Sequence, residues 1–397
     1  MKRKCKDIDI TDRDLISRAV YECIWEKLDR RDTVTLLSAY SGLKPKFIRN
    51  MIKDCGKPSM KNIIETIIDG IQSELINRSL SMKRIHYHDK TDPSSQKVRS
   101  IGIQDIKQQL FDYIAVEGLR PLLPRIGEYQ CASIKGRGQI YGIRIIHKWL
   151  QDPTTKYAAQ FDIRKCYESI NRDKLVAFLR KHVKNEHLLW LITILINTFR
   201  KGLSIGSYLS QFLCNLYLSQ IYHEIAENMY RTRKHKNGVI ERISLVKHEL
   251  MFMDDLIILG TNAKDLHTAV TLVISKADEM GLHIKESWVV FKRKSSKYGT
   301  GQFIDIMGFR VYRDHITIRK RVFIRIRRSL KKTMTLIKTH KRIFLYLARR
   351  CLSYFGQIKN SDSLYIRKKY NVIKIKQICR MEVSNEQKRC NLLAETA

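Results

Sequence analysis

The stretch FMDDLIILG at residues 252–260 most constrains how this chain can fold. Two adjacent carboxylates, Asp254 and Asp255, lie between the apolar runs LMFM and LIIL. A carboxylate is costly to bury without a partner, so we expect the acids at a turn and the apolar runs in two buried strands. Successive side chains of a strand face opposite ways, whereas in a tight turn both acids can approach one site. The pattern predicts a hairpin with an apolar body and an acidic tip.

A third acid, Asp162, ends a separate apolar strand, YAAQFDI at 157–163. If this strand lies beside the hairpin, Asp162 and Asp254 form a hard-oxygen site that suits Mg²⁺ held together with waters and substrate phosphates. Two such ions can activate a hydroxyl group and stabilise a leaving pyrophosphate. An aspartate pair alone is equally well explained as a simple turn between strands. The second strand-end acid favours the metal site.

The charge of the chain predicts a polyanionic partner. Its 397 residues contain 75 Lys and Arg against 39 Asp and Glu, a net charge of +36, and 44% of them are hydrophobic. The chain is therefore globular, with room for two or three subdomains, and nucleic acid is favoured over an acidic membrane surface. Residues 310–390 hold 24 Lys or Arg and four Asp or Glu. A solvated helix face usually mixes signs, so this region is predicted to contact a nucleic-acid backbone.

The spacing of the apolar residues predicts the remaining secondary structure. Residues 1–80 are predicted to be helical, 86–103 to form a polar hairpin or a loop between extended segments, and 105–123 a helix that ends near Pro121. Further helices are expected at 172–183, 187–199, 210–230 and 264–280, and an apolar helical stripe at Val322, Ile326, Leu330, Met334 and Ile337. The basic segment RTRKHKNGVIER (231–242) is predicted to be an insertion or a hairpin.

The location of the chain is predicted to be cytoplasmic. No apolar run reaches the roughly 20 residues that a membrane span needs, and the first residues lack the apolar stretch of a signal peptide. Nine scattered cysteines without a CxxC pair indicate reduced thiols. The simplest interpretation of each cysteine is a small residue of the core or the surface.

Several segments follow one another in the order found in one polymerase family. Beside QFDIRKCYESI (160–170) and FMDD they are KVRSIGIQD (97–105), QCASIKGRGQ (130–139), GLSIGSYLSQFLCNLYL (202–218), IMGFRVY (306–312) and SYFGQIKNSDS (353–363). Together they resemble the reverse transcriptases, over roughly residues 85–365. The resemblance is strongest to the bacterial enzymes of diversity-generating retroelements and related group II-like lineages.

The resemblance implies an α+β fold, the right-hand polymerase, in four parts. These are a helical N-terminal extension (1–85), fingers (86–156), a palm of antiparallel strands with helices (157–317), and a basic helical thumb and tail (318–397). It implies an RNA-directed DNA polymerase, a nucleotidyltransferase that makes cDNA from a cognate RNA. The implied cofactor is Mg²⁺ as two ions, with Mn²⁺ as an alternative. The implied partners are template RNA, the RNA/DNA hybrid and dNTPs, with a small accessory protein as a further candidate and no membrane.

The resemblance also assigns roles to residues. Asp162, Asp254 and Asp255 are the implied metal-binding and catalytic triad, with Asp255 in the lesser role, and the Ile163 carbonyl faces a metal. Tyr167 is the expected steric gate against a ribose 2′-hydroxyl, with core packing as the simpler alternative. The other implied nucleotide-binding residues are Lys97, Arg99, Ile205, Gly206, Ser210 and Gln211, although Ser210 is equally explained as a helix N-cap. The implied nucleic-acid contacts are Arg137, Arg310, Arg319, Lys320, Arg325 and Arg328.

Three departures from the family pattern bear on the biological setting. Ile205 stands where many relatives have Gln, and Ser210-Gln211 replaces the more usual Ser-Pro, as in the retroelement enzymes. Trp288 stands where a lysine is expected after Gly281-Leu282, which leaves Lys285 or Lys292 as the candidate proton donor to pyrophosphate. A diversity-generating retroelement is therefore the first interpretation, and an antiphage-defence or retron-like enzyme the second. A catalytically inactive nucleic-acid-binding palm and a DNA-templated or untemplated polymerase are the remaining alternatives.

Overall fold

A five-stranded sheet carries the acidic stretch of the chain. The computed structural model describes residues 3–91, 98–293 and 301–396, with side chains up to residue 385. The strand order in the sheet is β3 (Gln130–Cys131), β7 (His248–Phe252), β8 (Asp255–Gly260), β4 (Tyr157–Asp162) and β9 (Val289–Lys292). β3 runs parallel to β7, and the other neighbours are antiparallel. The two strands predicted to be neighbours, β4 and β8, do lie side by side.

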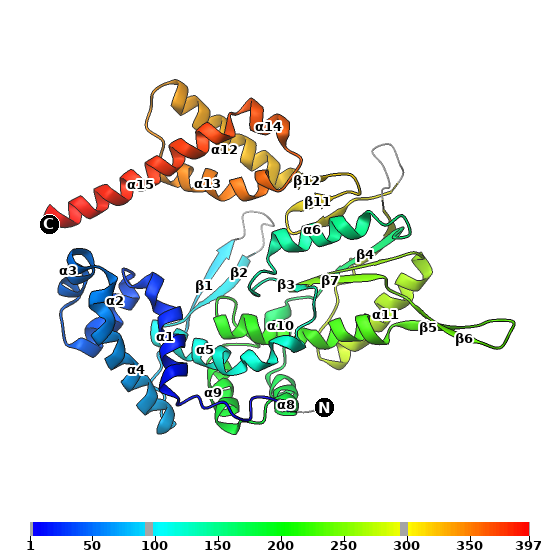
Figure 1. The fold of residues 1–397 in the computed structure, drawn as a ribbon, viewed down its shortest axis with the longest axis horizontal. Coiled ribbons are helices and arrows are strands. Elements are labelled where there is room, and N and C mark those ends of the chain that lie inside the picture. Colours follow the sequence, from blue (N-terminus) through cyan, green and yellow to red (C-terminus); the bar gives the residue numbers. More distant parts are fainter. Residues whose placement is uncertain (1–2, 92–97, 294–300, 397) are drawn as a thin grey trace.

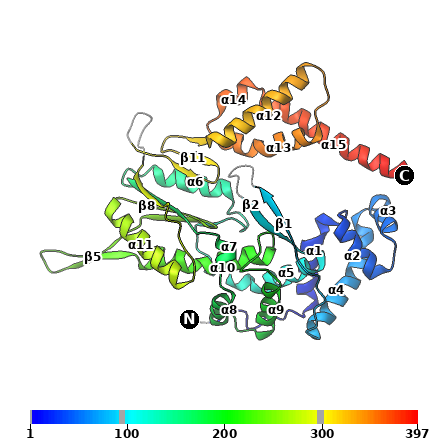
Figure 2. The same cartoon turned by 180° about the vertical axis from the view of Figure 1, so that it is seen from behind.

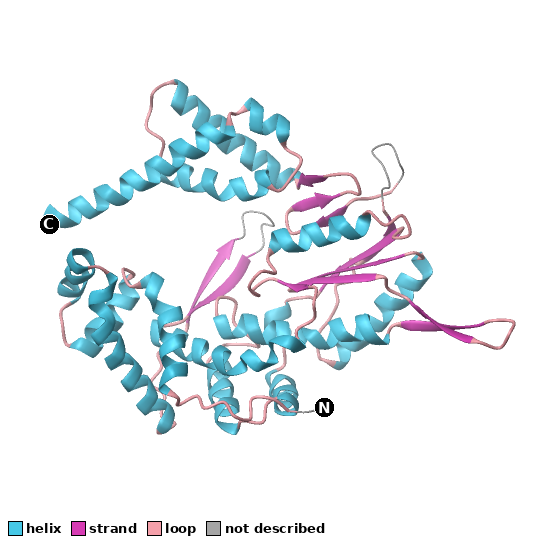
Figure 3. Cartoon of the chain, viewed as in Figure 1, coloured by secondary structure: helices cyan, strands magenta, loops and turns pink. Residues whose placement is uncertain are grey.

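The sheet is buried on both faces because its strands alternate between two cores. Leu256 and Ile258 of β8 belong to the core that contains α10 (Tyr208–His223) and α11 (Ala263–Glu279). Ile257 and Leu259 belong to the core on the other face. That core contains α6 (Gln139–Leu150) and the small sheet β10 (Ile304–Ile306), β11 (Phe309–Val311) and β12 (Ile316–Ile318). Burial on both faces explains the continuous apolar run of β8, and Figure 3 shows the strands flanked by helices.

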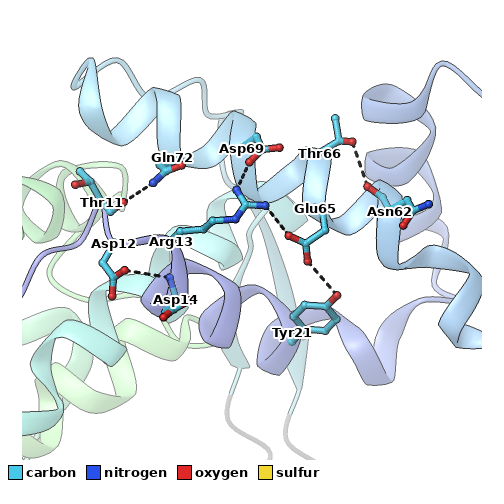
Figure 4. Close-up of polar contacts among 10 residues, drawn as sticks. All are labelled: Thr11, Asp12, Arg13, Asp14, Tyr21, Asn62, Glu65, Thr66, Asp69 and Gln72. Carbon is cyan, nitrogen blue, oxygen red and sulfur yellow. Dashed lines mark hydrogen bonds and ion pairs between the residues drawn. The ribbon is translucent and has the colours of Figure 1, made fainter.

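The predicted N-terminal helices are confirmed as α1 (Arg13–Ile24), α2 (Arg31–Ser41), α3 (Pro45–Cys55) and α4 (Lys61–Ile76). Polar contacts tie α1 to α4 (Figure 4). The Arg13 guanidinium donates to Glu65 at 2.6 Å and also to Asp69, and the Tyr21 hydroxyl donates to Glu65 at 3.4 Å. α1 also packs against α5 (Ile106–Leu119), which joins the four N-terminal helices to the rest of the chain.

The segments that lead to the sheet largely follow the predicted pattern. The polar hairpin is β1 (His86–Thr91) paired with β2 (Val98–Ile103). The helix predicted over 105–123 ends at Leu119 and continues as a 3₁₀ segment, Arg120–Arg125, which contains Pro121. The helices after β4 are α7 (Cys166–Ser169), α8 (Arg172–His182) and α9 (Glu186–Asn197).

The helix predicted over 210–230 is wrong at its C-terminal end. α10 ends at His223 and is followed by one π turn, Glu224–Asn228, after which the chain becomes extended. The basic segment that follows is a hairpin, β5 (Tyr230–Lys234) with β6 (Ile240–Ser244). It projects from the body of the molecule in both views (Figures 1 and 2).

The basic C-terminal region is a bundle of α12 (Lys320–Lys338), α13 (Leu345–Lys359), α14 (Leu364–Lys369) and α15 (Val372–Thr396). Ile326 and Leu330 of the predicted stripe are buried, and the other three stripe residues are partly buried against the same core. None of the described helices is both long and apolar enough to cross a membrane. The whole is a mixed α+β architecture.

Candidate active site

The acidic tip of the β7–β8 hairpin lies directly beside the end of β4. In the antiparallel register Asp162 is opposite Asp255, and the Ile163 amide donates to the Asp254 carbonyl at 3.0 Å. Met253 and Asp254 form the two-residue turn, in which Met253 has φ +56°. A non-glycine residue in this left-handed region is strained by about 1–2 kcal/mol. The surrounding sheet therefore holds the turn in a conformation that its sequence does not prefer.

The carboxylates are close enough that the pKa values of Asp254 and Asp255 are perturbed. Burial raises the pKa of Asp254 above its usual value, and the neighbouring Asp162 adds to the effect. Asp255 is exposed at the start of β8. Desolvation by the surrounding protein nevertheless raises its pKa to about 6, and the charges of Asp254 and Asp162 add to the effect. Such an arrangement is unfavourable unless a cation neutralises it.

The donor set fits a hard divalent cation. Oδ1 of Asp162 is buried without a hydrogen-bond partner among the described residues. No group of three His, Cys, Asp or Glu in the described part of the chain forms a metal cage by itself. Mg²⁺ needs no such cage, because it is usually held by one or two carboxylates with waters and substrate phosphates.

Lys285 is a cation in direct contact with this acidic site. Its Nζ donates to Oδ2 of Asp162, and its backbone amide donates to the Asp162 carbonyl at 3.0 Å. The Ile163–Ile284 bridge holds the Lys285 segment against the end of β4. Lys292, the other predicted proton donor, pairs with Tyr157 at the opposite end of β4. The strand rise places these two ends roughly 17 Å apart, so Lys285 alone of the two candidates lies in the site.

A cavity of about 760 Å³ opens beside the acids. Of the residues predicted from the sequence, it is lined by Arg99, Ile163, Tyr167, Ile205, Gly206, Gln211, Asp254 and Asp255, together with Lys285. The Tyr167 hydroxyl lies 3.8 Å from the Met253 sulfur, and burial raises the pKa of Tyr167. Lys97 lies outside the described residues, and Asp162 contributes no surface to the cavity.

The loop that contains Ile205 and Gly206 is held in place from two sides. The Leu203 amide donates to the Tyr167 carbonyl at 2.8 Å, and the Gly102 amide of β2 donates to the Ile205 carbonyl at 3.1 Å. Gly206 has φ +110°, and a Cβ there would lie 3.0 Å from the Gly102 carbonyl. Only glycine combines this conformation with this close approach, so the loop brings bare backbone to the cavity wall.

The start of α10 corrects the predicted role of Ser210 as an N-cap. Ser207 is the cap, since its side chain accepts from the Ser210 amide at 3.0 Å. Ser210 is fully buried, and its hydroxyl accepts from the Ser204 amide at 3.2 Å. Gln211, one residue further, reaches the cavity and accepts from the Ser133 hydroxyl at 2.8 Å.

Sequence reasoning missed Asp112, a fully buried carboxylate on α5. It accepts from the Ser207 hydroxyl at 2.7 Å and from the Leu209 amide at 3.4 Å, so it holds the first turn of α10. Burial raises its pKa to about 6. The only signal in the sequence was a charged residue within an otherwise apolar stretch of a predicted helix, LFDYIAV.

The predicted nucleic-acid contacts lie in two places. Arg310 and Arg319 flank Asp305 in the β10–α12 region, where the Arg319 Nε donates to the Asp305 carboxylate at 2.5 Å. Lys320, Arg325 and Arg328 follow on α12, of which Lys320 and Arg328 are exposed. Arg137 lies apart from them, in the loop before α6, and its guanidinium donates to the Gly127 carbonyl at 2.7 Å.

Comparison with known protein families agrees with this geometry. A family model described as reverse transcriptase (RNA-dependent DNA polymerase) matches residues 88–303, more than half of the chain. The match begins in β1, ends just before β10, and includes the three carboxylates and the loop before α10. No curated protein matches the chain at a significant level.

Proposed function

The chain belongs to the reverse transcriptase family, and we propose that it is an active RNA-directed DNA polymerase that works by two-metal nucleotidyl transfer. The observation that carries this proposal is the meeting of Asp162 with Asp254 and Asp255 where the end of β4 pairs with the tip of the β7–β8 hairpin. Asp254 and Asp255 line the cavity there, and Asp162 has a buried oxygen without a hydrogen-bond partner among the described residues. The divalent ions, when bound, would lower the pKa of the attacking hydroxyl and neutralise the leaving pyrophosphate.

In this proposal each carboxylate has a stated task. Asp162 and Asp254 would be the main ligands, Asp255 the supporting one, and the Ile163 carbonyl would face a metal. Lys285 balances Asp162 in the absence of metal and is placed to give a proton to the leaving pyrophosphate. The raised pKa values of Asp254 and Asp255 support a cation at this site, because a bound cation would favour the charged form of both carboxylates.

The incoming nucleotide is proposed to occupy the cavity beside the acids. Arg99, together with Lys97, would bind the triphosphate, and Tyr167 would exclude a 2′-hydroxyl by its ring. Ile205 and Gly206 would face the nucleotide through backbone, and Gln211 through its side-chain amide. Ser210 would act indirectly, by fixing the Ser204 amide. What supports these roles is the shared cavity lining and the fixed loop geometry.

The family implies that the central sheet is a polymerase palm. Around it we propose the four-part division: an N-terminal extension over 1–85, fingers over 86–156, the palm over 157–317, and a thumb and tail over 318–397. Arg137, Arg310, Arg319, Lys320, Arg325 and Arg328 would contact the backbone of template RNA and the RNA/DNA hybrid. Because such contacts release counterions, binding is expected to weaken strongly with salt.

For the biological setting we propose a diversity-generating retroelement in a bacterial cytoplasm, with an antiphage-defence or retron-like enzyme as the second candidate. Ile205 and the Ser210-Gln211 pair support this choice, because an apolar residue removes a polar contact to the base or template. The test is sequencing of cDNA copied from a defined RNA. Errors concentrated at template adenines are expected, and a uniformly low error rate would exclude the retroelement assignment.

The polymerase itself is tested by dNTP incorporation on poly(rA) primed with oligo(dT), in Mg²⁺ and in Mn²⁺. We expect incorporation by the wild-type protein and none above background by Asp254→Asn. Activity on a DNA template alone, or without any template, would point to the other polymerase classes. Absence of incorporation with every template and metal would favour an inactive nucleic-acid-binding palm.

A further inference from the structure

The β5–β6 hairpin is a long exposed ribbon that the polymerase reaction does not explain. Its strands pair from Tyr230–Ser244 to Lys234–Ile240, and the turn is closed by the His235 amide donating to the Val239 carbonyl at 2.8 Å. Both strands form a two-stranded sheet of their own, so their outer edges are unpaired within the described chain. A two-stranded ribbon is at best marginally stable in water. The exposed hairpin therefore contributes little to the stability of the fold, and a binding function is the alternative that we consider for it.

The register separates the cations of the hairpin between its two faces, because directly paired residues share a face. One face carries Arg231, Arg233, Glu241 and Ile243. Its charge is largely neutralised: Arg231 Nε lies 3.2 Å from the Asp265 carboxylate of α11, and Glu241 lies 2.9 Å from His235.

The other face carries Tyr230, Thr232, Lys234, Ile240, Arg242 and Ser244, which we call the cationic face. Lys234 and Arg242 have no acidic partner among the described residues, and both are exposed. Arg242 is directly opposite Thr232, so the two cations emerge about 7 Å apart along the ribbon. Lys236, exposed in the turn, adds a third cation near the tip.

We propose that the cationic face binds the phosphodiester backbone of base-paired RNA outside the active-site cleft, and that it thereby selects the structured RNA that is copied. This proposal rests on the polymerase function argued above. Charge complementarity identifies a polyanion, and two long side chains that emerge close together reach neighbouring phosphates. Double-stranded RNA is held in this way, by its shape and backbone rather than by its bases.

The geometry favours a base-paired segment over a single strand. Proteins that hold single strands use aromatic platforms on which bases stack. Tyr230 is the only aromatic residue of the two strands, and the Arg242 guanidinium lies 3.5 Å from its ring centroid. One ring face is therefore already occupied, and the hairpin lacks a stacking surface.

A simpler reading of the same cations is protection of the open strand edges against aggregation. The variant Lys234→Glu/Arg242→Glu separates the two, because glutamate still protects an edge but repels phosphate. A matched control, Arg180→Glu/Lys181→Glu, makes the same change in net charge on exposed residues of α8. Equal unfolding midpoints of the three proteins would establish that neither variant loses its fold.

The measurement is the affinity for a 20-base-pair stem-loop RNA, by fluorescence anisotropy over a series of salt concentrations. For Lys234→Glu/Arg242→Glu we expect binding to weaken about tenfold and the slope of log affinity against log salt to fall by roughly 2, as for two lost phosphate contacts. The α8 control is expected to change affinity less than threefold. Equal losses in both variants, or no loss in either, would overturn the proposal, and no loss would favour edge protection.

Two further measurements separate this inference from the proposed polymerase activity. A single-stranded RNA of the same length is bound in parallel, and an equal loss of affinity for it would overturn the assignment to base-paired RNA. Extension of oligo(dT) on poly(rA) by the wild-type protein is measured separately. Its absence would contradict the polymerase function while the stem-loop result still decides the role of the hairpin.

Discussion

Two consecutive hairpins of this chain have the same topology and opposite chemistry. β5–β6 and β7–β8 are both antiparallel, and only residues 245–247 separate them. β7–β8 is buried on both faces and ends in two acids, whereas β5–β6 is exposed along its length and ends in cations. The acidic tip of a buried hairpin can hold cations at the mouth of a cavity. Single charges on an exposed ribbon are weakened by water, so a basic ribbon favours a large polyanion that several of its charges can contact together.

The turns of the two hairpins differ in which residue adopts the left-handed backbone conformation. The exposed turn, Lys236-Asn237-Gly238, uses glycine at φ +80°, as an unsupported turn should. The turn of β7–β8, by contrast, has Met253 at φ +56°. Strain of this kind persists where the surrounding structure over-determines the backbone, and here it fixes Asp254 beside the end of β4.

The largest effect is expected from Asp254→Asn in the buried hairpin. Loss of one charge while size is kept should lower dNTP incorporation by about 10³-fold, because the metal loses a ligand. The free energy of unfolding without metal should not fall, since repulsion from Asp162 is relieved. Asp173→Asn, an exposed acid on α8, is the control. A matching variant, Asp255→Asn, should lose less activity, and the reverse order would exchange the roles proposed for the two acids.

Lys285→Ala tests whether the half-buried Asp162 depends on a cation from the chain itself. Its removal leaves Asp162 without a charge partner, so metal-free unfolding should become easier by about 1–2 kcal/mol. The stabilisation by added Mg²⁺ should increase, because the ion then replaces the lost charge. Incorporation should fall about tenfold if Lys285 also protonates pyrophosphate. Lys292→Ala, at the far end of β4, should leave all three quantities unchanged, and parity between the two variants would contradict the assignment.

The acidic hairpin could be predicted from sequence because its pattern is local. The apolar runs, the turn acids and the strand-end Asp162 each carry their own signal, and their meeting follows from strand pairing. The basic, glycine-containing segment 231–242 was predicted to be an insertion or a hairpin, and it forms a hairpin. The prediction of each hairpin rests on side chains within a few positions of one another, whereas the pairing of β4 with β8 joins distant segments.

What could not be predicted depends on contacts between distant segments. The predicted 210–230 helix stops at His223, in a π turn that no local residue marks. Asp112 meets Ser207 across 95 positions, and Lys285 meets Asp162 across 123. Helix spacing places each of these residues on an element but does not say which other element lies opposite it. The choice between Lys285 and Lys292 was therefore open until the fold was known.

The variant Glu249→Gln tests whether an acid in the β7–β8 hairpin makes the stability of the protein depend on pH. Burial raises the pKa of Glu249 on β7 to about 7, against an ordinary value near 4.5. Between these values the folded state holds more protons than the unfolded state, so stability falls as pH rises from about 4.5 to 7 and then levels off. Glu249→Gln should flatten this fall in chemical unfolding at pH 5, 6 and 7. Glu241→Gln in the exposed hairpin is the control, and identical pH slopes for wild type and Glu249→Gln would contradict the burial argument.

The smallest effect, Gly238→Ala, asks whether the exposed hairpin folds as a unit of its own. A Cβ at Gly238 meets no atom within 4 Å, so the change acts only through φ +80°, which disfavours alanine by about 1 kcal/mol. Because β5–β6 is exposed, it should open without the sheet. Amide hydrogen exchange should become about fivefold faster in β5 and β6 and stay unchanged in β7 and β8, while the global unfolding midpoint stays the same. Lys236→Ala in the same turn, where φ is not positive, should change neither quantity. If Gly238→Ala instead lowers the global midpoint and speeds exchange in both hairpins, the two are one cooperative unit, and the functional separation drawn between them loses its structural basis.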